Sequence, residues 1–290
     1  MVTLNVGSFF EADWDQRRHE VVAWINRLDA DVVCLQEVWQ DADDLNTAGW
    51  IADACATNYG WHFGGHPISW KERANPQFRF GSAILSRWPI DERNVWKLPI
   101  ADNPEDPIPG SMPWELVHVH TAGLDVYTTH LAPAPSHGRH RRVQVLAIDD
   151  LIRESRGDRD DFADYPNPRP NMPAILTGDF NAEPDSDEMR WLRGHTVIDD
   201  RTTFYQDAWR VAGDESQGLT QDWRTHPLAA SLNVHRKRID YVYVGDPFLR
   251  AGDSGRILQA EIMAHQELTG IQASDHMGLA VDIEWSARPD

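Results

Sequence analysis

Apolar and polar positions alternate in ways that predict strands and helices mixed from one end of the chain to the other. Apolar residues recur every three or four positions over 13–28 and 141–152, which predicts amphipathic helices, and 41–57 is predicted to be another helix. Short apolar runs bounded by turn residues predict the strands. These are 2–6, 31–36, 80–86, 124–129, 174–177, 239–244, 257–264 and 279–283. No repeat, low-complexity tract or linker interrupts the pattern, so we expect a single domain over residues 1–290.

The composition is typical of a soluble globular protein with a large core, because 41% of the residues are hydrophobic and 25% are charged. No apolar run approaches the ~18 residues that a membrane helix needs. The N-terminus lacks the charged and apolar regions of a signal peptide. We therefore expect a cytoplasmic protein, a monomer without stable membrane insertion. Of the two cysteines, Cys34 lies in an apolar run and is expected to be buried.

The net charge of −19 and the pI near 5.0 disfavour a protein that binds nucleic acid through a broad basic surface. Non-specific affinity for DNA comes mostly from the neutralisation of phosphates by basic side chains. Duplex DNA remains a possible substrate if a local basic strip forms beside the site. Its candidates are Arg139, Arg141, Arg142, Arg236 and Arg238.

The end of the predicted strand 174–177 carries the most informative chemistry. Thr177 and Gly178 lead into Asp179 and Asn181, which stand two residues apart. An extended backbone would point both side chains to the same side. A carboxylate and a carboxamide that face one spot are suited to hold a reacting oxygen beside a metal-bound group. The structural alternative is an Asx turn that merely closes the strand.

Polar residues also stand at the ends of other predicted strands or next to them. Each has a structural alternative: Glu37 could cap the next helix, His130 could be a satisfied buried histidine, and Asp240 could pair with Arg238. Buried carboxylates are costly unless they are paired or bind a metal, so several of them together indicate one shared cation site. The residues concerned are Asn5, Glu37, His130, Asp179, Asn181, Asp240, Asp275 and His276.

Six short segments, taken in order, resemble the endonuclease/exonuclease/phosphatase superfamily over residues 1 to about 285. They are Gln36-Glu37, Phe80 to Arg87 followed by Pro89-Ile90, Thr129-His130-Leu131, Gly178-Asp179-Phe180-Asn181, Arg238-Ile239-Asp240-Tyr241 and Ser274-Asp275-His276. The superfamily includes exonuclease III-like DNA repair enzymes, neutral sphingomyelinases, inositol-polyphosphate phosphatases and deadenylases. The resemblance implies an α/β (α+β) fold: a four-layer sandwich of two mixed sheets flanked by helices, with the site at one end.

The resemblance also implies a Mg²⁺ site, with Mn²⁺ as a possible substitute. Glu37 resembles the principal metal ligand, Asn5 stands beside it, and Asp275 is expected close to the metal. The repair enzymes carry a carboxylate two residues after the first asparagine, whereas this chain has Gly7. A second metal ligand is therefore in doubt.

The catalytic roles follow from the same resemblance. Asp179 resembles the carboxylate that activates or orients the attacking water, and Asn181 resembles a phosphate ligand. His276 resembles the histidine that contacts the scissile phosphate, with Asp240 as its orienting partner. His130 matches a phosphate-binding position that is histidine in the sphingomyelinase and phosphatase branches and tyrosine in repair endonucleases.

We therefore expect a Mg²⁺-dependent phosphoesterase that attacks its substrate in line with water. The expected substrate is a phosphodiester or phosphomonoester of a small molecule, a nucleotide or a lipid headgroup. The alternative is a metal-dependent DNA or RNA endonuclease or exonuclease, and a catalytically inactive binding scaffold is a further alternative. The loops 99–113 and 155–173 are either substrate lids or plain solvated loops. Trp61, Phe63 and Trp70 are candidates for an aromatic rim, although most tryptophans are expected in the core.

Overall fold

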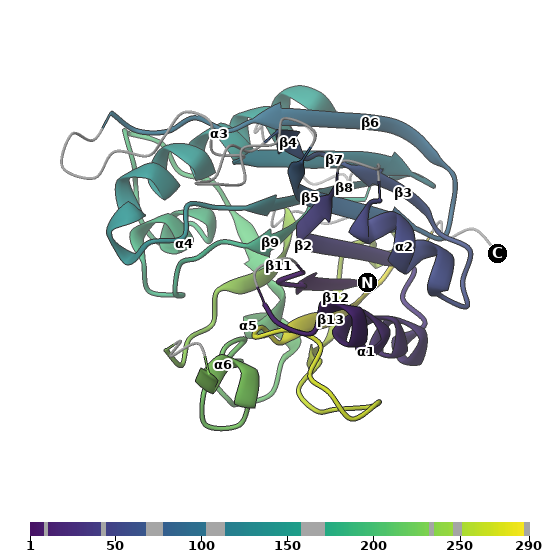
Figure 1. The fold of residues 1–290 in the computed structure, drawn as a ribbon. Coiled ribbons are helices and arrows are strands. Elements are labelled where there is room, and N and C mark those ends of the chain that lie inside the picture. The colour runs from purple at the N-terminus through teal and green to yellow at the C-terminus, as the bar shows by residue number, and fades with distance from the viewer. Residues whose placement is uncertain are drawn as a thin grey trace.

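Two mixed β-sheets stack face to face in the computed structural model, which describes residues 1–8, 11–41, 45–67, 78–102, 114–157, 172–231, 235–245 and 251–286 (Figure 1). The first sheet runs in the order β12 (Ile257–Met263), β13 (Gly278–Ile283), β1 (Val2–Asn5), β2 (Val32–Gln40), β5 (Arg79–Ser86) and β3 (Gly60–Phe63), and β4 (His66–Pro67) also pairs with β5. The second sheet runs in the order β10 (Tyr205–Asp207), β11 (Asp240–Gly245), β9 (Ile175–Asp179), β8 (Leu124–His130), β7 (Glu115–Thr121) and β6 (Ile90–Lys97).

Helices cover the outer face of each sheet. The helices α1 (Trp14–Leu28) and α2 (Thr47–Ala54) pack on the first sheet, and α3 (Gly138–Arg156) and α4 (Asp187–Leu192) pack on the second. Two short helices, α5 (Ala208–Ala212) and α6 (Pro227–Ser231), and 3-10 turns at Pro135–His137 and Ala251–Asp253 complete the elements. The predicted four-layer α/β sandwich is confirmed.

The period of two along the strands divides the apolar residues between a core inside the sandwich and a core under each helix layer. In β2, Val33 and Leu35 face α1 and α2, whereas Val32 and Cys34 face the second sheet. Cys34 is fully buried, as predicted. A hydrogen-bonded polar group interrupts the inner core near one end of the sandwich, where Gln36 Nε2 donates to Thr128 Oγ1 across the two sheets at 2.9 Å. That end carries the candidate site.

The outer half of the second sheet contains strands that the hydrophobic pattern did not indicate. β6 is an edge strand of the sheet, and half of its residues are exposed, so its sequence is mostly polar. Next to it, β7 and β8 hold a buried polar cluster in which Asp125 accepts hydrogen bonds from His118 at 3.2 Å and His120 at 2.8 Å and pairs with Arg156. These polar side chains lie on the face of the sheet toward α3, at positions that are usually apolar in a strand covered by a helix.

The predicted helix over 41–57 is shorter than expected, because β2 extends to Gln40 and α2 begins only at Thr47. Asn46 starts this helix, since its side chain accepts hydrogen bonds from the backbone amides of Ala48 and Gly49 at 2.8 and 3.2 Å. Glu37 is therefore not the cap of α2, and the structural alternative considered for it is wrong.

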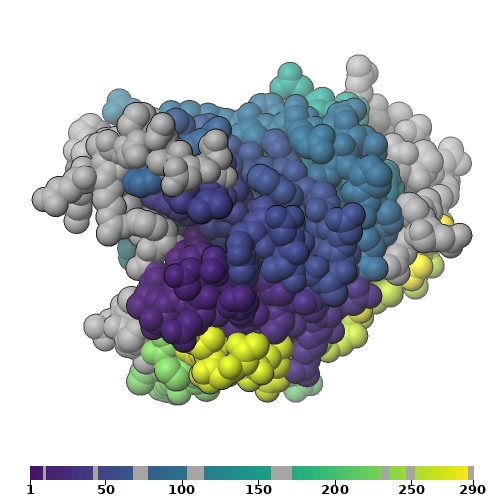
Figure 2. Space-filling view, turned by 45° about the vertical axis from the view of Figure 1, so that its right-hand side comes forward, coloured from purple at the N-terminus to yellow at the C-terminus, as the bar shows by residue number. Residues whose placement is uncertain are grey.

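The first helix and the last part of the chain lie side by side, as Figure 2 shows where the purple and yellow segments meet. Glu20 of α1 accepts hydrogen bonds from the backbone amides of Leu268 and Thr269, both at 2.6 Å. Trp24 donates to the carbonyl of Gln266 at 3.2 Å. These contacts fix the loop between β12 and β13, from which Asp275 and His276 enter the site.

Among the described residues, no helix is long and apolar enough to cross a membrane. Most of the two predicted lid loops lies outside the described residues, as does Trp70 of the suggested aromatic rim. Trp61 is 38% exposed and Phe63 is half-buried.

Candidate active site

Asn5 and Glu37 come from two parallel neighbours of the first sheet, β1 and β2. Asn5 is paired in register with Gln36, and Asn5 Nδ2 donates to Glu37 Oε1 at 3.0 Å. The pairing of β2 with β5 shifts between Leu35 and Val38, and Glu37 has a φ of 57° in this bulge. Residues other than glycine rarely adopt this backbone conformation. Those that do adopt it cluster at functional sites. Glu37 thus lies within β2, and not at its end as we expected.

His130 and Asp179 face each other across a parallel pair in the second sheet. They are partners in the register of β8 and β9, and His130 Nε2 lies 3.6 Å from Asp179 Oδ2. Gly178 makes this pairing possible, because a Cβ built on it would lie 2.0 Å from the carbonyl oxygen of Thr129. The His130 ring packs near the rings of Phe80 and Trp114, whose centroids are 6.4 and 6.0 Å away.

Asn181 lies in a turn, and not in the extended backbone that we expected between Asp179 and Asn181. Its φ of 51° departs from an extended backbone, and its amide N donates to Asp179 Oδ1 at 2.8 Å. The Asx turn considered as an alternative is therefore present. Asn181 Nδ2 donates to the carbonyl of Leu131 at 3.0 Å. The turn holds Asp179 by one oxygen and leaves its other oxygen, Oδ2, directed toward the site.

Asp240 and His276 form a buried pair beside Asp179. Asp240 begins β11 opposite Asp179 in the antiparallel register, and its Oδ2 lies 2.9 Å from His276 Nδ1. Arg238 pairs instead with Asp207 through two contacts of 2.9 and 2.8 Å, so the predicted alternative of an Arg238 to Asp240 pair is wrong. Burial alone would lower the pKa of His276, but the charges of Asp240 and then Asp275 raise that pKa well above its ordinary value.

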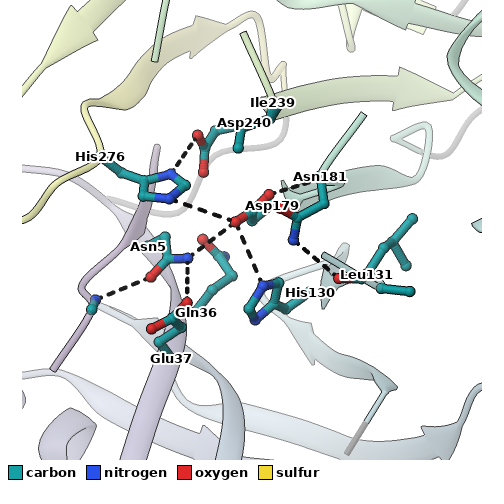
Figure 3. Close-up of polar contacts among 12 residues, drawn as sticks. Asn5, Gln36, Glu37, His130, Leu131, Asp179, Asn181, Ile239, Asp240 and His276 are labelled. Carbon is teal, nitrogen blue, oxygen red and sulfur yellow. Dashed lines mark hydrogen bonds and ion pairs between the residues drawn. The ribbon is translucent and has the colours of Figure 1, made fainter. Parts of the chain in front are cut away.

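Three of these side chains, Asn5, His130 and His276, converge on one oxygen atom, Asp179 Oδ2 (Figure 3). Asn5 Nδ2 donates to it at 3.1 Å, and His276 Nε2 lies 3.8 Å away on the side opposite His130. One sheet supplies Asn5, and the other supplies His130 and Asp179. Asp179, Asp240 and His276 also offer ligand atoms that all lie within 4.8 Å of one another. A carboxylate held among donors in this way can accept a proton or bind a cation.

A second group of carboxylates lies next to this centre and has the chemistry of a hard-cation site. It comprises Glu37, Asp275 and Glu11, with Arg17 as the neighbouring guanidinium. Burial, the hydrogen bond to Asp275 and the charge of Asp275 raise the pKa of Glu11 to about 10, and burial raises the pKa of Glu37. Oxygen donors with unbalanced negative charge fit Mg²⁺ or Mn²⁺ and do not fit a thiolate or multi-histidine zinc centre.

Two residues at the site carry no signal in the strand pattern. Gln221 Nε2 lies 2.8 Å from His276 Nε2 and donates to Asp275 Oδ2 at 3.1 Å. Glu11 accepts a hydrogen bond from the backbone amide of Asp275 at 3.2 Å. Both residues stand in irregular segments, where neither hydrophobic periodicity nor a strand end singles them out. Only the fold brings them to the other site residues.

The comparison with protein families agrees with this architecture. The model of the Endonuclease/Exonuclease/phosphatase family matches residues 2–276. The chain belongs to this family. Its members are hydrolases that act on phosphate esters. No curated protein sequence matches the chain closely enough to count as a relative.

Solved structures of the endonuclease/exonuclease/phosphatase family share the fold at low sequence identity. A family protein from Leptotrichia buccalis C-1013-b is 18% identical, with 98% of each chain covered and a TM-score of 0.64. A family protein from Beutenbergia cavernae DSM 12333 is 18% identical, with 97% of this chain and 70% of that chain covered and a TM-score of 0.66. D. rerio TDP2, complexed with a single-strand DNA product, is 16% identical, with 98% of each chain covered and a TM-score of 0.66.

The arginines that were candidates for a basic strip are mostly neutralised by acidic partners. Arg141 and Arg238 are buried, and Arg139 is exposed. Four of the five arginines form ion pairs, which are Arg141 with Glu188, Arg142 with Asp199, Arg236 with Asp222 and Arg238 with Asp207. Paired guanidinium groups have little charge left to offer a nucleic-acid backbone.

Proposed function

We propose that this chain is a divalent-metal-dependent phosphoesterase that hydrolyses a phosphodiester or phosphomonoester of a small molecule, a nucleotide or a lipid headgroup. One observation carries the proposal: Asp179 Oδ2 lies among Asn5, His130 and His276, directly beside a group of buried carboxylates. In this arrangement Asp179 could accept a proton beside donors suited to phosphate oxygens and beside oxygen atoms suited to a cation.

Glu37, Asn5 and Asp275 would hold the cation, and Mg²⁺ or Mn²⁺ suits their oxygen atoms. When bound, such an ion neutralises the charge on the phosphate oxygens that otherwise repels an incoming nucleophile. Asn5 has a second task, because its amide nitrogen donates to both Glu37 and Asp179. It thereby fixes the orientation of the proton acceptor relative to the carboxylates that hold the ion.

Asp179 would orient the attacking water and accept its proton. Its Oδ1 is held by the Asn181 backbone amide, so the carboxylate cannot rotate freely and Oδ2 stays in position. His276 would stabilise the charge that develops on the phosphate, because the carboxylates around it favour its protonated form. Asp240 orients His276 through Nδ1. His130 and Asn181 would contribute further contacts to the phosphate.

The charge distribution supports a compact substrate. The net charge is −19, and four of the five arginines that were candidates for a basic strip are already paired with carboxylates. A long polyanion would be repelled over roughly the Debye length of ~8 Å at physiological ionic strength. A small phosphate ester can enter with its charge compensated by the cation.

A nuclease is the second candidate function. It is favoured by one observation, the structural likeness over 98% of both chains to D. rerio TDP2, which was solved with a single-strand DNA product. A single strand exposes fewer phosphates per unit length than a duplex and needs a smaller basic surface. The two candidates therefore differ in substrate and share the same catalytic residues.

A competition assay separates the two candidates. Bis-p-nitrophenyl phosphate, nucleotides, sphingomyelin, inositol phosphates, single-stranded DNA and plasmid DNA are offered to the enzyme at matched salt and Mg²⁺. We expect a higher kcat/KM on a small ester than on DNA, complete loss of activity in EDTA, and recovery when Mg²⁺ or Mn²⁺ is added. Glu37→Gln should abolish the activity. If nanomolar enzyme nicks plasmid DNA and leaves the small esters intact, the nuclease is the correct function. If a verified metal-free protein has full activity, the proposal of a metal-dependent enzyme is wrong.

A further inference from the structure

The space next to Gly7 is filled by the carboxylate of another residue, Glu11. Gly7 has a φ of 52°, and a Cβ built on it would lie 1.8 Å from Glu11 Oε1 and 2.4 Å from Glu11 Cδ. Real Cβ atoms do not approach other heavy atoms closer than 3.0 Å. Glu11 can therefore occupy its position only because residue 7 has no side chain.

The backbone and its neighbours direct the Glu11 carboxylate inward. The Glu11 amide donates to the carbonyl of Gly7 at 3.3 Å, which holds these two residues close together. The side chain of Glu11 is only 5% exposed, and its Oε2 lies 3.2 Å from Arg17 Nη1. The same oxygen accepts a hydrogen bond from the backbone amide of Asp275 at 3.2 Å. A carboxylate that bridges these groups is held rigidly.

Arg17 is already satisfied by main-chain acceptors. Its guanidinium donates to the carbonyls of Val6, Gly7, Ala12 and Ala273 at distances between 2.7 and 3.2 Å. Arg17 is 1% exposed, and Glu11 supplies the charge that lies closest to it. The charges of Glu11, Asp275, Asp13 and Glu37 all act on this single buried guanidinium, which cannot balance all of these carboxylates when they are ionised.

Glu11 is connected to the cation ligands proposed above through Gly7 and through Asp275. Asn5 Oδ1 accepts a hydrogen bond from the Gly7 amide at 3.0 Å, and Asn5 Nδ2 donates to Glu37. On the other side, Glu11 contacts Asp275. We propose that Glu11 is a further carboxylate of the cation site and takes the place that an acidic side chain at position 7 would fill. This inference rests on the proposed function, since it assumes that Glu37 and Asp275 bind a cation.

The direct test is the affinity of the purified protein for Mn²⁺, measured by the electron paramagnetic resonance signal of free Mn²⁺ and by calorimetry. Glu11→Gln keeps the shape of the side chain and removes its charge. We expect this variant to bind Mn²⁺ at least about 10-fold more weakly than the wild type. Asp15→Asn is the matched control, because Asp15 is exposed, pairs with Arg18 at 3.2 Å and lies on the same helix as Arg17. Its Mn²⁺ affinity should equal that of the wild type.

A second experiment moves the carboxylate from residue 11 to residue 7 and tests whether Mn²⁺ binding returns. Gly7→Asp alone should weaken Mn²⁺ binding, because the new Cβ collides with the Glu11 carboxylate. Glu11→Ala alone should weaken it by removing the carboxylate. The double variant Gly7→Asp/Glu11→Ala should bind Mn²⁺ more tightly than either single variant, since the space is then free and aspartate tolerates the left-handed conformation of residue 7. A double variant no better than Glu11→Ala would overturn the inference.

Glu37→Gln distinguishes failure of this inference from failure of the proposed function. If Glu37→Gln loses Mn²⁺ binding while Glu11→Gln stays within twofold of the wild type, Glu11 serves only Arg17 and the proposed function stands. If the wild type and Glu37→Gln bind Mn²⁺ equally or not at all, both proposals are wrong. Thermal unfolding in EDTA shows whether each variant is folded. If Glu11→Gln unfolds at a lower temperature in EDTA but binds Mn²⁺ as tightly as the wild type, that result also counts against the inference.

Discussion

Replacing Asp240 by asparagine tests the proposed orienting role most directly. The pair to be perturbed is His276 Nδ1 and Asp240 Oδ2, 2.9 Å apart, with Asp240 fully buried and His276 5% exposed. A hydrogen bond to a charged group contributes about 1.5–3 kcal/mol. Two unit charges at ~4 Å and an effective dielectric constant of ~20 interact by about 4 kcal/mol. These figures bracket the loss of transition-state stabilisation when the carboxylate becomes an amide.

The bracket converts to a fall in kcat of about 10- to 10³-fold, because ~1.4 kcal/mol corresponds to a factor of ten in rate. The assay is steady-state hydrolysis of the best ester from the substrate panel at saturating Mg²⁺, with kcat and KM determined separately. We expect the loss in kcat, since Asp240 touches neither the substrate nor the cation ligand Glu37 in the proposed arrangement. Asp150→Asn is the matched control, because Asp150 is exposed and pairs with Arg201 on the outer helix layer. Its kinetics should be unchanged.

Two results would refute this reasoning. A loss smaller than threefold, in a variant that unfolds at the wild-type temperature, would mean that the 2.9 Å contact does not support the charged form of His276. A loss as large as that of His276→Ala would mean that Asp240 takes part in the reaction directly, and the assignment of Asp240 as a positioning residue would be withdrawn.

Three further predictions follow from other contacts. Asp179→Asn and His276→Ala should each lower kcat by about 10²–10⁴-fold with little change in KM, measured on the same ester, and near wild-type turnover of Asp179→Asn would remove its role. Asp125→Asn should cost about 2 kcal/mol of unfolding free energy at pH 7, because hydrogen bonds from histidines outweigh burial and lower the pKa of Asp125 from 3.8 to about 2. This contribution is present above pH 3.8 and is lost as the pH falls toward 2, so urea denaturation of wild type and variant should converge there. Gly178→Ala should destabilise the protein by at least about 2 kcal/mol in the same assay, because its Cβ would meet the Thr129 carbonyl at 2.0 Å, and an unchanged midpoint would contradict this packing.

The sequence predicted the fold well where strands alternate between a helix-facing and a sheet-facing side. Val32 to Leu35 is such a segment, and its position in β2 follows from the pattern. The prediction failed for β6 and β7. β6 is an exposed edge. In β7 the histidines that bind Asp125 alternate with Val117 and Val119, so only one face of this buried strand is strongly apolar. Tertiary contacts, which a local pattern does not contain, decide such strands.

The candidate site was predictable to the extent that its residues end strands or match the family segments. Asp179 and His130 lie together because they are register partners in adjacent strands. The orientation of Asn181 was not predictable, since it depends on a left-handed turn that two-residue spacing does not reveal. Gln221 and Glu11 could not be found either, because irregular loops carry them to the site. The glycine at position 7 was the one sequence feature connected with Glu11. We interpreted it as a missing metal ligand, and it does not indicate which residue fills the space beside it.

The pairing of β1 with β13 joins the beginning of the described chain to its end, since Val2 is in register with Ala280. The same pairing brings Asn5 near His276. During synthesis on a ribosome, the first strand must wait for almost the whole chain before its antiparallel neighbour exists. The apolar layers under α3 and α4 can assemble earlier from nearer segments. A nascent or truncated chain that lacks β13 would thus contain most of its secondary structure without a complete candidate site, and the proposed hydrolysis would begin only when the last strand docks.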